Sequence, residues 1–122
     1  KKMVHRDIPV KGAKALILGV TFKENCPDVR NTRVVDIYLD LCDFGLDVTV
    51  FDPWVDQEEV SKEYGISVIN NKNDLSQTYS TIVLAVSHNQ FLEMDIDALK
   101  EMNSLLFDIK GFLPQNMVDA RL

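Results

Sequence analysis

The chain has 122 residues and a mass of 13.9 kDa, which is enough for one compact core and too little for two. Hydrophobic residues make up 46% of the sequence and charged residues 26%, and only 9 residues are Gly or Pro, which excludes a disordered or low-complexity chain. The net charge of −6 argues against nucleic-acid or anionic-membrane binding, and no apolar run approaches the roughly 20 residues of a membrane-spanning helix.

Basic residues are concentrated at the start of the chain. Residues 1–33 contain eight of the 13 basic side chains and three acidic ones, whereas residues 34–122 carry a net charge of −11. This asymmetry is compatible with a local anion site and equally with a solvated patch that faces a neighbouring domain.

The elements alternate along the chain. Residues 1–12 contain Pro9 and Gly12, do not begin with Met, and are expected to form the end of a preceding helix or a linker in a longer protein. From residue 13 onward, short apolar runs alternate with amphipathic windows, which is typical of βα units around a parallel sheet. The predicted strands cover residues 13–18, 47–51, 67–69, 81–86 and 104–108, and the predicted helices cover residues 34–44, 58–64 and 96–102. We expect residues 81–86 to form a central strand, because their apolar run is continuous.

The first predicted helix carries the strongest periodic pattern. Its apolar residues recur at helical spacing, with Asn31 or Thr32 as the expected N-cap and Gly45 as the expected stop.

The longest connection, residues 19–32, follows the first predicted strand. Ligands of open parallel sheets bind beyond the carboxyl ends of the strands, so this loop is the first candidate site. Its Lys23 and Arg30 suit phosphate oxygens near the positive end of a helix. The spacing also allows these cations to pair with Glu24 and Asp28 and only order the loop. The loop lacks the G-x-G-x-x-G motif, so the domain is not expected to hold a dinucleotide in the ordinary manner.

Three further polar residues follow later strands. His88 could contact a substrate or transfer a proton, but a structural role in capping the next turn is favoured. Lys110 could reach a phosphate or lie on the surface. Asp52 occupies the place where dinucleotide-binding domains hold a ribose, but without the glycine loop a role in the turn is favoured.

The two cysteines, Cys26 and Cys42, do not fit a zinc-binding pattern, so we expect free thiols in a reducing cytoplasm and no metal site. Cys26 lies near Lys23, which would favour a thiolate, but no matching base follows it. Cys42 falls within the first predicted helix and is expected to be packed or half-exposed.

The segment from Leu18 to Thr32 resembles the G-x-x-F-K-x-x-x-x-D-x-R-x-[ST] motif that opens the C-terminal domain of the UDP-glucose/GDP-mannose dehydrogenase family. Three later segments are similar to the same family in the same order, and the resemblance covers about residues 10–115. The A-V-x-H-x-x-F and D-x-K-G forms are most similar to the branch that oxidises UDP-N-acetylhexosamines for capsular, Vi-type or O-antigen polysaccharides. The three later segments are residues 45–53, 85–91 and 107–111.

The resemblance implies a three-layer α/β/α domain with a five-stranded parallel sheet of order 3-2-1-4-5. Residues 13–122 would form the UDP-sugar-binding domain, preceded in the whole enzyme by an NAD-binding Rossmann domain and a central helix that carries a homodimer interface. Family enzymes oxidise the sugar C6 alcohol to a carboxylate in two NAD-dependent steps. Their catalytic cysteine lies in a G-F-G-G-x-C motif that this sequence lacks, so Cys26 does not inherit its role and the isolated domain is expected to be inactive.

The resemblance also implies site residues. Phe22 and Lys23 would contact the UDP-sugar, and Arg30 would reach the NAD bound mainly by the other domain. Lys110 stands near a basic residue that contacts substrate in some members, while Gly111 stands where others have a second Arg. No catalytic residue is assigned to this chain. A non-catalytic nucleotide-sugar-binding module and an enzyme that acts on UDP-glucose or GDP-mannose are the alternatives.

Overall fold

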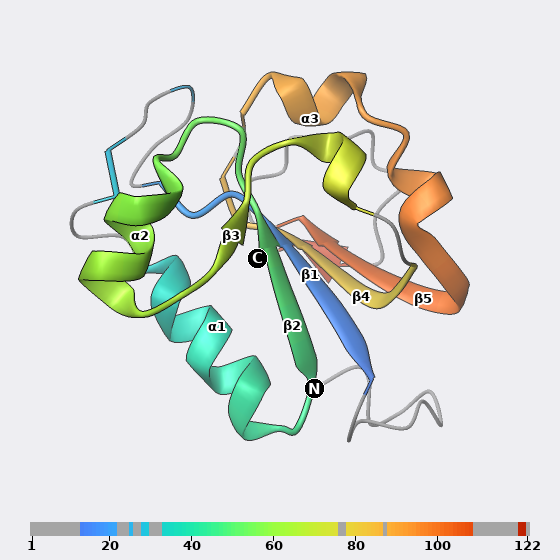
Figure 1. The fold of residues 1–122 in the computed structure, drawn as a ribbon. Helices are drawn as coiled ribbons and strands as arrows, with labels where there is room; N and C mark the ends of the chain where they lie inside the picture. Colours follow the sequence, from blue (N-terminus) through green and yellow to red (C-terminus); the bar gives the residue numbers. More distant parts are fainter. Residues whose placement is uncertain are drawn as a thin grey trace.

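The computed structural model describes residues 13–21, 25, 28–29, 33–75, 78–86, 88–108 and 120–121. Its six strands form one sheet in the order β3-β2-β1-β4-β5-β6, in which every pairing is parallel (Figure 1). The predicted α/β class and the strand order 3-2-1-4-5 are confirmed, and the structure adds β6 beside β5. The strands are β1 (Lys14–Leu18), β2 (Asp47–Phe51), β3 (Val68–Ile69), β4 (Tyr79–Leu84), β5 (Lys100–Asp108) and β6 (Ala120–Arg121).

The order of the strands reverses at β1. Leu18, the last residue of β1, pairs with Phe51 of β2 on one side and with Leu84 of β4 on the other. The carboxyl ends of these three central strands therefore lie side by side, at the place where open α/β sheets bind their ligands.

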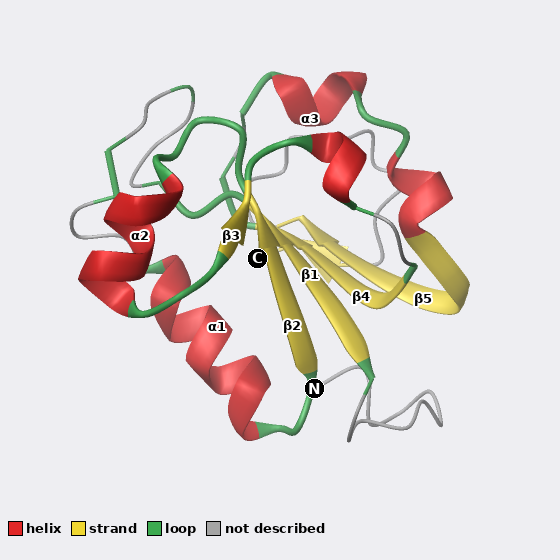
Figure 2. Cartoon of the chain, in the orientation of Figure 1, coloured by secondary structure: helices red, strands yellow, loops and turns green. Residues whose placement is uncertain are grey.

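Helices cover both faces of the sheet (Figure 2). Because side chains alternate along a strand, Ile17 packs with Val34 and Val60 under the two longer helices, whereas Leu16 and Leu18 point to the opposite face. Among the described residues, no helix has the length and apolarity to cross a membrane. The helices are α1 (Val34–Asp43), α2 (Gln57–Tyr64) and α3 (Gln90–Glu93), and the 3-10 turns are η2 (Lys72–Asp74) and η3 (Ile96–Leu99).

Residues 96–102 differ from the prediction. The expected helix is wrong, because only a 3-10 turn forms at residues 96–99 and β5 already begins at Lys100, which pairs with Tyr79 of β4. Hydrogen bonding to a neighbouring strand here outweighs a short helical pattern. At α1, Arg33 occupies the N-cap position without a side-chain cap, so the expectation of Asn31 or Thr32 as the cap is wrong.

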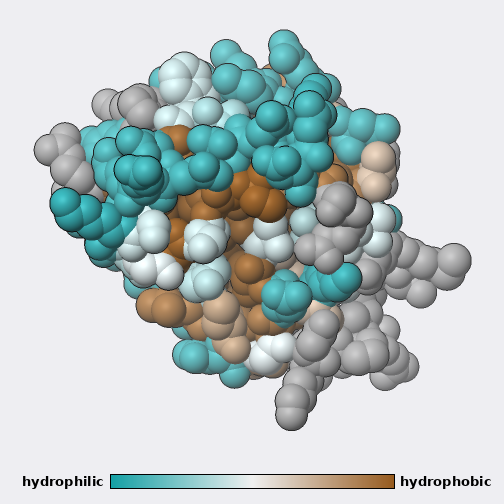
Figure 3. Space-filling model, viewed as in Figure 1, coloured by the Kyte–Doolittle hydropathy of each residue, from teal (hydrophilic) through white to brown (hydrophobic). Residues whose placement is uncertain are grey.

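The molecular surface changes in character from one end of the sheet to the other. Figure 3 shows apolar residues in a band across the middle of this face, and hydrophilic residues over the upper part, where the carboxyl ends of the strands lie. The candidate site described below lies at this polar end of the molecule.

Candidate functional site

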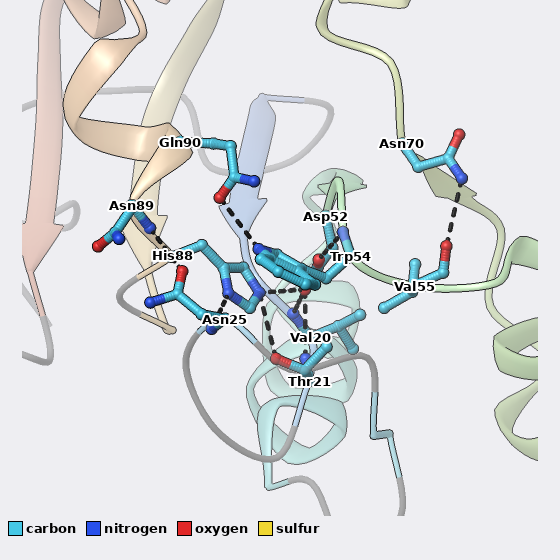
Figure 4. A network of polar contacts seen from close by, with 10 residues as sticks. All are labelled: Val20, Thr21, Asn25, Asp52, Trp54, Val55, Asn70, His88, Asn89 and Gln90. Carbon is cyan, nitrogen blue, oxygen red and sulfur yellow. Dashed lines mark hydrogen bonds and ion pairs between the residues drawn. The ribbon is translucent and has the colours of Figure 1, made fainter.

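Three loops meet at the carboxyl ends of the central strands: those that follow β1, β2 and β4 (Figure 4). Backbone hydrogen bonds join them to the sheet, with the Gly19 amide donating to the Phe51 carbonyl at 2.9 Å and the Ala85 amide to the Leu18 carbonyl at 3.0 Å. The first residues of each loop are thus an extension of the rigid sheet rather than a free connection.

Gly19 sets the direction of the loop after β1. Its φ is +97°, in the left-handed region, and a Cβ at this position would lie 2.6 Å from Cβ of Val86. No side chain fits that gap without displacing the β4 loop, so only glycine lets the two loops approach this closely.

Asp52 lies directly after β2 and is fully buried. Its Oδ2 accepts hydrogen bonds from the amides of Val20 at 2.7 Å and Thr21 at 3.3 Å, and its Oδ1 accepts one from the Trp54 amide at 2.8 Å. The predicted role in the turn is confirmed by the bond to Trp54. Because both carboxylate oxygens point inward and are occupied, this residue does not fit the ribose-binding role of a dinucleotide-binding domain.

His88 follows β4, is fully buried, and uses both ring nitrogens. Nδ1 lies 2.8 Å from the Asn25 amide nitrogen, and Nε2 lies 2.9 Å from Oδ2 of Asp52 and 3.1 Å from Oγ1 of Thr21. A backbone N–H can only donate, so Nδ1 must be the acceptor. We therefore assign a neutral imidazole whose proton is on Nε2 and is donated to the Asp52 carboxylate.

Asn25, in the loop after β1, is hydrogen-bonded to two residues of the loop after β4. Its φ of +54° places it in the left-handed region, which Asn tolerates better than most residues. Its Oδ1 accepts a hydrogen bond of 2.9 Å from the Asn89 amide, in addition to the bond between its own amide and His88. Two hydrogen bonds thus fix Asn25 against the residues that follow β4.

Aromatic rings enclose the imidazole. The ring centroids of Trp54 and Phe91 lie 6.0 and 5.4 Å from that of His88, and Trp54 Nε1 donates to Oε1 of Gln90 at 3.0 Å. The His88 carbonyl accepts the Phe91 amide at 3.1 Å, but the N-cap of α3 is Asn89, so the expectation that His88 caps the next turn is wrong. With its ring buried and both nitrogens occupied, His88 is not available to contact a substrate or relay its proton.

A cavity of about 470 Å³ lies beside this network, between the ends of β2 and β3 and helix α3. Gln90 connects the network to the cavity, because it lines the cavity and accepts the hydrogen bond from the indole of Trp54. The sequence pattern did not predict this cavity, and its one sequence signal is the polar run at residues 70–74, directly after the third predicted strand. Its lining includes Phe51, Pro53, Asn70, Lys72, Gln90 and Met94.

The four residues that the resemblance assigns to ligand contacts lie outside the described residues, and so does Cys26. They are Phe22, Lys23, Arg30 and Lys110. Cys42 is exposed, so the expectation of a packed or half-exposed thiol is wrong. Its neighbour Leu41 takes the inward position on α1 and packs against the core, which leaves Cys42 on the outer side.

The fold and the site define a class of protein: a doubly wound α/β domain that places a loop without a dinucleotide motif at the reversal of its strand order. The chain belongs to the UDP-glucose/GDP-mannose dehydrogenase family, because residues 16–115 match the model of that family's UDP binding domain. The resemblance inferred from the four motifs is thereby confirmed.

Individual relatives agree with this membership. The chain is 45% identical to the UDP-N-acetyl-D-glucosamine 6-dehydrogenase of Salmonella typhi and 42% identical to that of Pseudomonas aeruginosa, in both cases over 100% of its own length. It spans 29% of the length of each relative. Among solved structures, an NDP-N-acetyl-D-galactosaminuronic acid dehydrogenase from Methanosarcina mazei Go1 superposes with a TM-score of 0.78 at 19% identity, over 93% of this chain and 24% of that one.

Proposed function

We propose that residues 13–122 form the C-terminal, UDP-sugar-binding domain of an NAD-dependent nucleotide-sugar 6-dehydrogenase. The substrate would be a UDP-N-acetylhexosamine, oxidised to the uronic acid with two NAD per sugar for surface polysaccharide synthesis. The observation that carries the proposal is the 45% identity, over the whole chain, to a UDP-N-acetyl-D-glucosamine 6-dehydrogenase, within a family model for a UDP binding domain.

The task of this domain would be to bind and orient the sugar nucleotide. Lys23 supplies a cation for the pyrophosphate and Phe22 an apolar contact, while Lys110 adds a second cation beyond β5. Orientation of this kind lowers the barrier by fixing the reacting carbon before hydride transfer begins.

We assign none of the described residues to the oxidation itself. Asp52 and His88 are both buried and committed to each other, and Cys42 is exposed on α1. Thiol chemistry and most of the NAD contacts would come from the parts of the protein outside this chain, and Arg30 would contact the NAD bound there. NAD, when bound, accepts the hydride. The complete protein would work as a homodimer.

The first test is NADH formation by the complete protein. Four substrates would be compared: UDP-N-acetylglucosamine, UDP-N-acetylgalactosamine, UDP-glucose and GDP-mannose. We expect two NADH per UDP-N-acetylhexosamine consumed. A folded protein that binds a UDP-sugar but forms no NADH would instead be a non-catalytic binding module, and a preference for GDP-mannose would contradict the assignment of the substrate.

The roles of the cations are tested in the same assay. Lys23→Ala should raise the KM for the UDP-sugar at least about tenfold, since a charge-assisted hydrogen bond is worth roughly 1.5–3 kcal/mol. Arg30→Ala should raise the KM for NAD more than that for the sugar nucleotide. Lys62→Ala, on the exposed side of α2, is the matched control and should change neither value.

A further inference from the structure

We propose that the cavity between β2, β3 and α3 binds the N-acetylated sugar of the substrate, and that Gln90 and Asn70 select its acetamido group. This inference rests on the proposed function, in which the substrate is a UDP-N-acetylhexosamine. The cavity has a volume of about 470 Å³, within the range of about 300–1,000 Å³ that is usual for small-molecule sites. It lies next to the reversal of the strand order, since β2 pairs directly with β1.

The floor of the cavity is apolar and fixed to the sheet. Phe51 and Pro53 lie on either side of Asp52, whose buried carboxylate is held by backbone amides. The ring of Phe51 packs against that of Phe91, with their centroids 6.1 Å apart, and Met94 adds an unbranched side chain. Such a floor can take up a methyl group and the C–H face of a sugar ring. Because Phe51 is only 2% exposed, the described lining offers no open aromatic face on which a nucleobase could stack.

Two half-buried carboxamides on the walls have defined orientations. Oε1 of Gln90 accepts the indole N–H of Trp54 at 3.0 Å, so its Nε2 is left to donate to a ligand. Nδ2 of Asn70 donates to the Val55 carbonyl at 3.2 Å, so its Oδ1 is left to accept. An indole N–H can only donate and a carbonyl can only accept, which fixes both amides against a flip. Figure 4 shows the two remaining atoms turned away from these partners, and neither has another hydrogen-bond partner among the described residues.

An acetamido group is complementary to this lining. Its carbonyl oxygen accepts a hydrogen bond, its N–H donates one, and its methyl group is apolar. The cavity offers Nε2 of Gln90 to the carbonyl, Oδ1 of Asn70 to the N–H, and the apolar floor to the methyl group. A hydroxyl group at the same carbon of the sugar has one heavy atom and no methyl group, so it makes fewer of these contacts.

The rim of the cavity carries one charge of each sign. Lys72 belongs to η2 and Glu93 to α3, and both side chains are exposed. A phosphate attracted by Lys72 would be repelled by Glu93. The hydroxyl groups of a neutral sugar can accept from the ammonium group and donate to the carboxylate, so they satisfy both charges. The lining therefore fits the sugar ring better than the pyrophosphate.

The experiment measures the Kd of the complete protein for three nucleotides, UDP-N-acetylglucosamine, UDP-glucose and UDP, by calorimetric titration without NAD. Gln90→Glu keeps an acceptor for the Trp54 indole but replaces the donating nitrogen with an oxygen. Asn89→Asp is the matched control, because it adds the same charge one residue earlier, outside the cavity lining, where the side chain of Asn89 does not cap α3. Met94→Trp fills the cavity with a bulky side chain.

We expect the wild type to bind UDP-N-acetylglucosamine at least about tenfold more tightly than UDP-glucose. Gln90→Glu should reduce this preference to within about twofold, because it replaces a hydrogen bond to the acetamido carbonyl with a repulsive contact. Met94→Trp should weaken the binding of both sugar nucleotides at least about tenfold, since it occupies the space of the ring. Asn89→Asp should keep the preference of the wild type. UDP has no sugar, so every folded variant should bind it as the wild type does.

A wild type without a preference for the acetamido sugar would overturn the proposal by itself. The proposal also fails if folded Gln90→Glu keeps the preference, or if folded Met94→Trp binds both sugar nucleotides as tightly as the wild type. UDP binding shows whether each variant is folded. Failure of the proposed function has a different signature, namely a wild type that prefers UDP-N-acetylglucosamine but forms no NADH with it.

Discussion

Replacement of Asp52 by Ala tests how far this domain depends on one buried carboxylate. The side chain is 0% exposed and accepts hydrogen bonds from the amides of Val20, Thr21 and Trp54 and from Nε2 of His88. Asp52→Ala removes all four acceptor contacts at once. Water can replace the contact with the half-buried Trp54, but Val20 and Thr21 are each only 1% exposed.

The expected loss of stability follows from the buried donors that remain. A buried donor without a partner costs about 1–3 kcal/mol, and the Val20 amide becomes such a donor. The Thr21 amide loses a longer bond of 3.3 Å, whereas Nε2 of His88 can still donate to Oγ1 of Thr21 at 3.1 Å. Removal of a buried carboxylate offsets part of this cost, because the charge no longer has to be desolvated. We therefore expect Asp52→Ala to lower the free energy of unfolding by about 2–4 kcal/mol, out of the 5–15 kcal/mol typical of a domain.

Urea unfolding followed by the fluorescence of Trp54, the only tryptophan in the chain, measures this loss, with far-UV circular dichroism as a second probe. The matched control is Asp56→Ala in the same loop, where an exposed carboxylate caps α2 through one bond of 2.9 Å to the Glu58 amide. Loss of such a cap costs about 1 kcal/mol. If Asp52→Ala costs no more than Asp56→Ala, the buried network does not hold the loops together as argued.

Two further predictions concern backbone strain and alkaline pH. Gly19→Ala should lower the free energy of unfolding by about 2–4 kcal/mol, because the left-handed φ and the 2.6 Å approach to Val86 Cβ act together. Gly65→Ala, at φ +70° with no atom within 4 Å, should lower it by only about 1 kcal/mol in the same urea titration. Equal losses in the two variants would contradict the steric argument. Burial, followed by the negative charge and hydrogen bond of Cys42, raises the pKa of Tyr38 above its ordinary value of 10.0. The folded state therefore keeps a proton that the unfolded state loses, so urea midpoints should fall as the pH rises above 10.0, and Tyr38→Phe should weaken that dependence.

The central strands could be predicted because their sequence pattern and their environment agree. β1 and β4 are buried along almost their whole length, and each contains a run of at least three successive apolar residues. Glycines mark the ends of β1, α1 and α2. Residues 90–103 could not be predicted in the same way, although the predicted strand at residues 104–108 lies within β5. The early start of β5 depends on pairing with Tyr79, and the four residues of α3 are too few to show a helical period.

For the candidate site, the position of the residues could be predicted from the sequence, but the direction of their side chains could not. The rule that ligands bind at strand ends placed Asp52 and His88 at the same edge of the sheet, and the structure confirms that edge. Whether they face solvent or the interior depends on how the loops leave the sheet, which Gly19 and Asn25 set through their left-handed conformations. Neither conformation has a sequence pattern, so the inward orientation of both side chains became visible only in three dimensions.

The use of Asp52 explains how a fold of this type can serve a ligand other than a dinucleotide. In dinucleotide-binding domains an acidic residue at the end of the second strand points outward to a ribose, and a glycine-rich turn brings the backbone to the pyrophosphate. Here the acidic residue points inward and holds the start of a longer loop, partly through His88. Under the proposed function, Lys23 on that loop would supply the contact to phosphate that a backbone turn supplies in dinucleotide-binding domains. The sequence lacks the glycine motif and the structure buries Asp52, so introducing the motif alone, or turning the carboxylate outward alone, should not create a dinucleotide site.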